Sequence, residues 1–129
     1  MALHLNISRK ELLTALTSLQ NVTSKKGTIA ILSNILIQTG NDMVELTGTD
    51  LEVGLRRNVP CEIKSPGSIT LPSKKLFEIV RESTADIITL EEKENNWVTI
   101  SAGSSLYNLA GMPNEEFPEF PDYEKTSLK

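Results

Sequence analysis

An internal repeat constrains this sequence more than any other feature. Residues 6–13 (NISRKELL) align with residues 70–77 (TLPSKKLF), an offset of 64 residues in a chain of 129. Each copy starts with residues that suit a strand and continues with the apolar spacing of an amphipathic helix. We therefore expect two copies of one unit that pack against each other and share a core.

The first unit is predicted to contain a strand, a helix and three further strands. Leu3, Leu5 and Ile7 alternate with polar residues, as in a strand with one buried face. Ser8 and Glu11 have the spacing of a capping box, which places the start of a helix directly after that strand. The apolar stripe of this helix consists of Leu12, Leu13, Leu16 and Leu19. The three strands that follow are predicted at residues 28–38, 43–47 and 51–59.

The second unit repeats this order of elements. Its helix is predicted to bury one set of side chains and to expose another: Leu76, Phe77 and Val80 against Lys74, Glu78 and Arg81. Its three strands are predicted at residues 86–91, 97–101 and 106–109. The expected fold is therefore α+β, with two βαβββ repeats. Its two helices pack side by side on one face of antiparallel sheet, related by an approximate internal twofold.

Charge is divided unevenly along the chain. The formal net charge is −4, but residues 1–81 hold ten basic and seven acidic residues, and residues 82–129 hold three basic and ten acidic ones. If the repeat is real, several basic side chains would lie on one side of the domain: Lys10, Lys25, Lys26, Lys74 and Arg81. Isolated cations of this kind bind phosphates without reading bases. The alternative is that these are solvated helix faces with no partner.

Catalysis has little support in the sequence. His4 is the only histidine and is predicted in a strand, so no second histidine completes a metal site or proton relay. Cys61 has no histidine nearby in the sequence, so we expect a half-buried thiol rather than a reactive one. Asp50 and Glu52 are more typical of the start of a strand than of an acid–base pair. Phosphate loops of the Walker type and GxGxxG motifs are absent. We therefore expect a non-catalytic protein without cofactor or metal.

The predicted compartment is the cytoplasm. Cys61 is the only cysteine, so no internal disulfide can form, as is usual in a reducing environment. The first residues lack the pattern of a signal peptide, and no run of about 18 apolar residues that could cross a membrane is present.

Four segments of the chain carry distinctive motifs in a fixed order. They are TIAILSNILIQ at 28–38, LTGTDLE at 46–52, LPSKKLFEIVR at 71–81, and MP followed by EFP within 112–118. These motifs resemble the amino-terminal domain of bacterial sliding clamps, the beta subunit of DNA polymerase III. The resemblance runs from about residue 3 to residue 120. It implies a clamp domain at 1–120 and the start of an interdomain linker at 121–129, consistent with a proline-rich, acidic tail.

The resemblance implies a function in DNA replication. Such clamps are three-domain subunits that pair head to tail into a ring-shaped homodimer around duplex DNA, with two helices of each domain facing the hole. This chain would supply the first domain of a processivity factor that tethers DNA polymerase III. Polymerase and clamp loader would bind the other domains. The implied non-specific contacts to the DNA backbone are Lys26 first, then Lys25, Arg9, Lys10, Lys74 and Arg81.

The same resemblance implies a subunit interface with the third domain of a neighbouring clamp subunit. Its residues would be Lys75, Ile79, Tyr107 and Leu109. One alternative is that Ile79 and Tyr107 only complete the core of this domain. The chain also departs from the family, because related clamps often carry arginine at the positions of Ser101, Ser104 and Leu106.

Two other functions remain open at this point. One is a free-standing protein–protein interaction domain with a clamp-like fold. The other, far less favoured, is a small hydrolase that uses Cys61 or a carboxylate pair.

Overall fold

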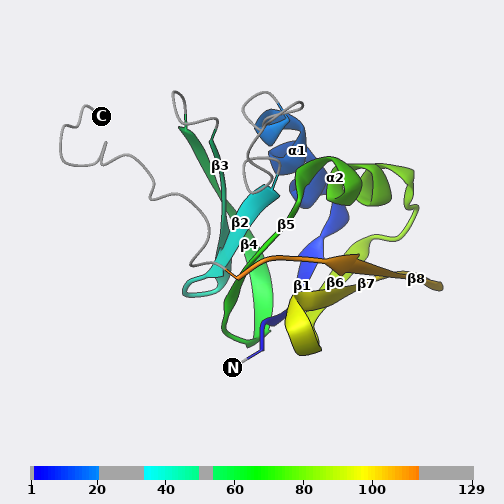
Figure 1. Ribbon diagram of the computed structural model, residues 1–129. Helices are drawn as coiled ribbons and strands as arrows, with labels where there is room; N and C mark the ends of the chain where they lie inside the picture. The colour runs from blue at the N-terminus through cyan, green and yellow to red at the C-terminus, as the bar shows by residue number, and fades with distance from the viewer. Residues whose placement is uncertain (1, 21–33, 50–53, 114–129) are drawn as a thin grey trace.

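A computed structural model of the chain describes residues 2–20, 34–49 and 54–113. Two helices, α1 (Arg9–Leu19) and α2 (Ser73–Glu82), lie side by side on one side of the molecule, and the strands spread out on the other side (Figure 1). None of the helices in the described ranges is long and apolar enough to span a lipid bilayer.

The order of elements confirms the predicted repeat. The first unit consists of β1 (His4–Ser8), α1, β2 (Asn34–Thr39), β3 (Met43–Thr49) and β4 (Gly54–Ser65). The second consists of β5 (Ser68–Pro72), α2, β6 (Ile87–Glu92), β7 (Trp97–Ala102) and β8 (Ser105–Ala110), with the short 3-10 helix η2 (Glu94–Asn96) between β6 and β7. Each unit is therefore βαβββ, as the sequence predicts.

The two units exchange strands within one antiparallel sheet. The strand order is β5-β2-β3-β4-β1-β6-β7-β8. The first strand of each unit pairs with the second strand of the other unit, β1 with β6 and β5 with β2. This reciprocal pairing is the arrangement that an approximate internal twofold requires. The two units cannot be separated without breaking both pairs.

β4 is longer than predicted because it has two successive partners. Its first half, from Gly54 to Pro60, pairs with β3, and its second half, from Cys61 to Ser65, pairs with β1. Pro60 lies where the partner changes, so its missing N–H group costs little there. The predicted end of this strand at residue 59 is therefore wrong. The predicted strand at 28–38 is described only from residue 34 onwards.

The core lies between the helices and the inner faces of the strands. Ser8 caps α1 as predicted, since the Glu11 N–H donates to Ser8 Oγ at 3.3 Å, which is one of the two bonds of a capping box. The predicted apolar stripes need three corrections: Leu13 in α1 and Phe77 in α2 are only half-buried, and Ala15 in α1 is buried. The fully buried helix residues are Leu12, Leu16 and Leu19 in α1, and Leu76 and Val80 in α2.

Candidate nucleic-acid interface and edge-strand surface

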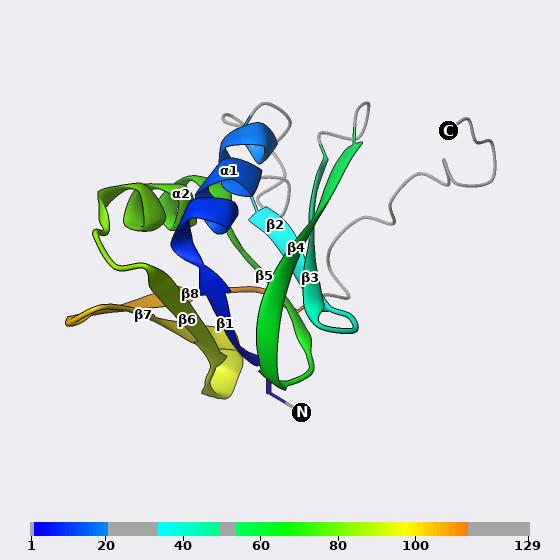
Figure 2. The same cartoon turned by 180° about the vertical axis from the view of Figure 1, so that it is seen from behind.

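The two helices run antiparallel and are joined at both ends by side-chain hydrogen bonds. Arg9 Nε donates to the carbonyl oxygen of Val80 at 2.9 Å, and Arg9 Nη2 donates to that of Arg81 at 3.2 Å. At the other end, Gln20 Nε2 donates to Ser73 Oγ at 2.8 Å. The start of α1 is therefore fixed beside the end of α2, an arrangement that can be followed from the other side of the molecule in Figure 2.

Three of the basic residues predicted to contact DNA are exposed on this helix pair. They are Lys10 on α1, and Lys74 and Arg81 on α2. Because the helices are antiparallel, Lys10 and Arg81 lie at one end of the pair and Lys74 lies at the other. We call these three residues the helix face. The three cations are therefore distributed over both ends of the helix pair.

Arg81 is also held by neighbours within α2. Its guanidinium lies 5.2 Å from the centre of the Phe77 ring, and its Nη2 is 3.4 Å from Glu82 Oε2. Both members of this ion pair are more than half exposed, so the pair contributes little to stability and weakens further in salt. The cation–π contact orients the guanidinium without removing its charge.

Arg9 has a different environment from the other predicted DNA contacts. Its side chain is half-buried, and two of its N–H groups are used by the carbonyl groups at the end of α2. A cation at this position also complements the partial negative charge of the helix C-terminus. Arg9 therefore joins the helices, and its contact with DNA stays a prediction. Lys25 and Lys26 lie outside the described residues.

The four residues predicted at the subunit interface come together although they are far apart in the sequence. Lys75 and Ile79 of α2 line one surface hollow of about 290 Å³ with Tyr107 and Leu109 of β8. β8 is the last strand in the sheet order, so in the described part of the chain no strand pairs with its outer side. We call this surface, α2 and β8 around the hollow, the edge-strand surface.

The structure bears on the alternative that Ile79 and Tyr107 only complete the core of this domain. Both side chains pack against the core, yet both are only half-buried and contribute to the hollow. Part of the apolar surface of each side chain therefore stays exposed. Leu109 is 8% exposed and forms the floor.

The charges around this hollow are mainly acidic. Glu78 and Glu82 line it with Lys75 as the one cation among its lining residues. Leu106 is 67% exposed on the same edge strand, but it alternates with Tyr107 and Leu109, so its side chain lies on the face of β8 opposite the hollow. A complementary partner would therefore present apolar and basic groups.

One basic residue that sequence reasoning did not select also lies beside the helices. Arg57 of β4 donates from Nη1 to Ser18 Oγ of α1 at 2.9 Å. The available signal was the alternation of the strand, since Arg57 is two residues from the buried Val59 and must lie on the same face. Gln20 was missed too, because its contact with Ser73 depends on how the two helices pack.

Of the residues considered for catalysis, the structure describes Cys61 and His4. Burial and, to a lesser extent, the Asp42 carboxylate raise the pKa of the Cys61 thiol, which keeps it protonated. His4 is half-exposed on β1, and no metal-binding group of three or more His, Cys, Asp or Glu occurs among the residues that the structure describes. Asp50 and Glu52 lie outside those residues.

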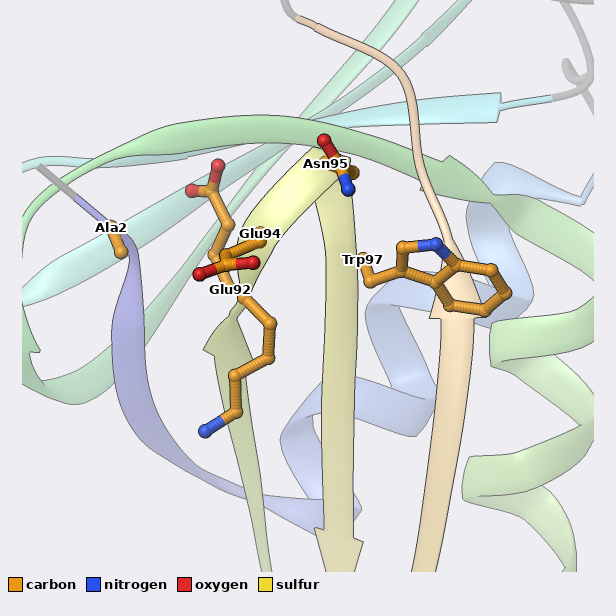
Figure 3. Close-up of a pocket in the computed structure, with 6 residues that line it drawn as sticks. Ala2, Glu92, Glu94, Asn95 and Trp97 are labelled. Atoms are coloured by element: carbon orange, nitrogen blue, oxygen red, sulfur yellow. The ribbon is translucent and has the colours of Figure 1, made fainter.

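A wider hollow lies at the turn between β6 and β7, but its polar groups do not converge. It measures about 690 Å³ and is lined by Ala2, Glu92, Lys93, Glu94, Asn95 and Trp97. Figure 3 shows the Trp97 ring directed away from the carboxylates of Glu92 and Glu94. Glu92 instead accepts a hydrogen bond from the Leu3 N–H at 3.1 Å. Glu92 thereby helps to hold the chain in place just before β1.

Comparisons with known proteins identify the family to which this chain belongs. The family model of the DNA polymerase III beta subunit, N-terminal domain, matches residues 3–121. The chain is 36% identical over 118 residues to the beta sliding clamp of Chlamydia muridarum, covering 92% of this chain and 32% of that protein. It is 37% identical over 116 residues to the beta sliding clamp of Caulobacter vibrioides, covering 88% and 31%.

Solved structures give the same result. The DNA polymerase sliding clamp from Bacillus subtilis superposes with a TM-score of 0.92 at 26% identity, covering 97% of this chain and 35% of that one. The clamp from Caulobacter crescentus gives 0.87 at 35% identity, covering 92% and 33%. The chain thus spans about a third of the length of the relatives it matches. It belongs to the DNA polymerase III beta subunit family, the beta sliding clamps, and corresponds to their amino-terminal domain.

Proposed function

We propose that this chain forms the first domain of a ring-shaped sliding clamp, which encircles duplex DNA and tethers DNA polymerase III during replication. One observation carries the proposal. The single helix α2 contributes Lys74 and Arg81 to the helix face, and Lys75 and Ile79 to the edge-strand surface. A ring subunit needs these two adjacent surfaces, one toward the enclosed DNA and one toward the next subunit.

The helix face suits a contact that slides. Lys10 and Lys74 are point charges, and the guanidinium of Arg81 already contacts the Phe77 ring and Glu82. The three cations are therefore suited to neutralising phosphates rather than to reading base edges. Binding would therefore go to phosphates of any sequence and weaken steeply with salt. A net charge of −4 keeps the overall affinity for DNA low, so that ring closure rather than tight binding would retain the protein. Lys25, Lys26 and Arg9 are proposed to add to these contacts.

The edge-strand surface suits continuation of the sheet into a neighbouring subunit. The outer side of β8 offers backbone N–H and C=O groups in the geometry that an added strand requires. The half-buried Ile79 and Tyr107 would be covered by the third domain of that subunit. Glu78 and Glu82 would then face basic groups.

The remaining parts of the proposal follow from family membership. The clamp domain would occupy residues 1–120, and a linker would start at 121–129. Polymerase and clamp loader would bind the other two domains of such a subunit. The domain would act in the cytoplasm, without catalysis or a cofactor.

The proposal can be tested on the 129-residue chain by NMR. Titration with short duplexes at low salt should shift amide signals around Lys10, Lys74 and Arg81, equally for two unrelated sequences. Added salt should reverse the shifts. Signals that stay unchanged, or that move for one sequence only, would contradict the proposal.

A further inference from the structure

Two neighbouring arginines of β4 point to opposite faces of the sheet. Arg56 pairs with Glu45 of β3, with 3.3 Å between Nε and Oε2. Arg57 alternates with Arg56 and lies on the face of the buried Val59, toward α1. The two residues carry the same charge on the same strand, but only Arg57 lies on the helix side.

Arg57 reaches past the edge of the core to α1. Its Nη1 donates to Ser18 Oγ at 2.9 Å, and Arg57 as a whole is half-exposed. In residues 2–20, 34–49 and 54–113, no carboxylate lies within ion-pair distance of Arg57, unlike Arg56, Lys64, Arg81 and Lys93. Its charge is therefore not neutralised by a near neighbour in those ranges.

Arg57 and Lys10 line the same groove between α1 and β4. The groove measures about 350 Å³, and its other lining residues are Glu11, Thr14, Ala15, Asn58, Val59 and Pro60. Glu11 is the one acidic side chain among them. The Thr14 hydroxyl is turned to the backbone, where it donates to the Lys10 carbonyl oxygen at 3.0 Å. Small side chains along α1 thus let a large anion approach both cations.

We propose that Arg57 binds a backbone phosphate of duplex DNA in this groove and so extends the helix face from α1 onto β4. The inference rests on the proposed function and adds a contact to it. A guanidinium can hold two phosphate oxygens at once, with a geometry that lysine lacks. Its bond to Ser18 fixes one end of the side chain in advance, so that the side chain gives up little freedom on binding.

NMR of the arginine side chains tests this without any substitution. In a titration of the 129-residue chain with a short duplex, the Nε–Hε signal of Arg57 should shift together with the amides around Lys10. The signal of Arg56 should stay in place and serves as the internal control. If the helix-face amides shift but Arg57 does not, this inference fails while the proposed function stands. If no signal shifts, the proposed function itself fails.

A second arm uses inorganic phosphate as the probe. The proposal predicts that phosphate at the concentration of the duplex phosphates leaves the Arg57 signal unchanged, because only a duplex engages several cations together. An equal shift with both probes would mean a general anion site and would overturn the assignment to DNA.

Matched variants give a quantitative check. Arg57→Gln should reduce the slope of log affinity against log salt concentration by about 0.9, the value for one phosphate contact in B-DNA. Arg56→Gln removes the same charge from the opposite face and should leave the slope unchanged. The Arg57→Lys variant should keep the slope but bind the duplex more weakly, because lysine keeps the positive charge without the two parallel N–H donors of a guanidinium. Equal slopes for the two glutamine variants would contradict the proposal.

Discussion

The guanidinium of Arg9 donates its Nε–H to the carbonyl oxygen of Val80, 71 residues further along the chain. This bond joins the first residue of one repeat's helix to the last turn of the other's. The same side chain also donates to the Arg81 carbonyl oxygen. Arg9 therefore fixes the position of Arg81 on the helix face through the backbone of α2.

Replacement of Arg9 by alanine should lower the free energy of unfolding by about 1–3 kcal/mol, the range for hydrogen bonds to a charged group together with the helix-terminus charge effect. Urea unfolding of the 129-residue chain measures this. Lys10→Ala is the matched control, because Lys10 is exposed on the same turn of α1, and it should change stability by less than about 0.5 kcal/mol. Equal effects of the two substitutions would show that Arg9 does not join the helices.

Gly111 is needed where the chain leaves β8 and bonds to β5. A Cβ atom at this position would lie 2.4 Å from the Thr70 carbonyl oxygen, which accepts the hydrogen bond of the Met112 N–H. Gly111→Ala should therefore destabilise the domain by about 1–3 kcal/mol through overpacking. At Gly40 the nearest atom would be 3.6 Å away, so Gly40→Ala should be nearly neutral. Thermal melting distinguishes the two variants, and similar melting temperatures would contradict this packing.

Ile79 and Val80 are neighbours with different predicted roles. Val80 is fully buried, so Val80→Ala should lower the free energy of unfolding by about 2 kcal/mol. Ile79 is only half-buried, so Ile79→Ala should lower it by less than about 1 kcal/mol. The reason is that Ile79 keeps area for a partner at the edge-strand surface. Urea unfolding measures both values. A cost at Ile79 equal to that at Val80 would favour a pure core role.

The Cys61 thiol should be unreactive at neutral pH. Burial and the Asp42 carboxylate raise its pKa, so the thiolate fraction is smaller in the folded chain than in the unfolded one. The folded state holds this proton more tightly. The resulting stability is complete below the ordinary thiol pKa and is lost as the pH rises through the raised value. Alkylation rates of Cys61 against pH should therefore rise later than those of a small free thiol. A rate profile that matches the free thiol would contradict the raised pKa.

Much of the fold could be predicted because local signals agreed with one another. The offset between residues 6–13 and 70–77 predicts both βαβββ units, and the capping box marks the start of α1. The end of β4 was missed because Pro60 is typical of a strand end, and only the change of partner from β3 to β1 explains it. Burial of Ala15 rather than Leu13 depends on the final helix packing.

The candidate site could be predicted in part. The meeting of Lys75 and Ile79 with Tyr107 and Leu109 was expected from the family resemblance, and the four residues do line one hollow. The joining role of Arg9 could not be read from the sequence, since it depends on a partner 71 residues away. Alternation along β4 would have placed Arg57 on the helix side.

The most direct test of DNA binding through the helix face is the salt dependence shown by two triple variants, measured by fluorescence anisotropy with two unrelated duplexes. The first variant changes Lys10, Lys74 and Arg81 together to glutamine. It should reduce the slope of log affinity against log salt concentration by about 0.9 for each phosphate that the protein no longer binds. The control changes Arg56, Lys64 and Lys93, cations paired with Glu45, Glu62 and Glu91. It should leave the slope unchanged with both duplexes. Equal slopes for the two triple variants, or a preference of the unmodified chain for one duplex, would contradict a sequence-independent DNA contact at the helix face.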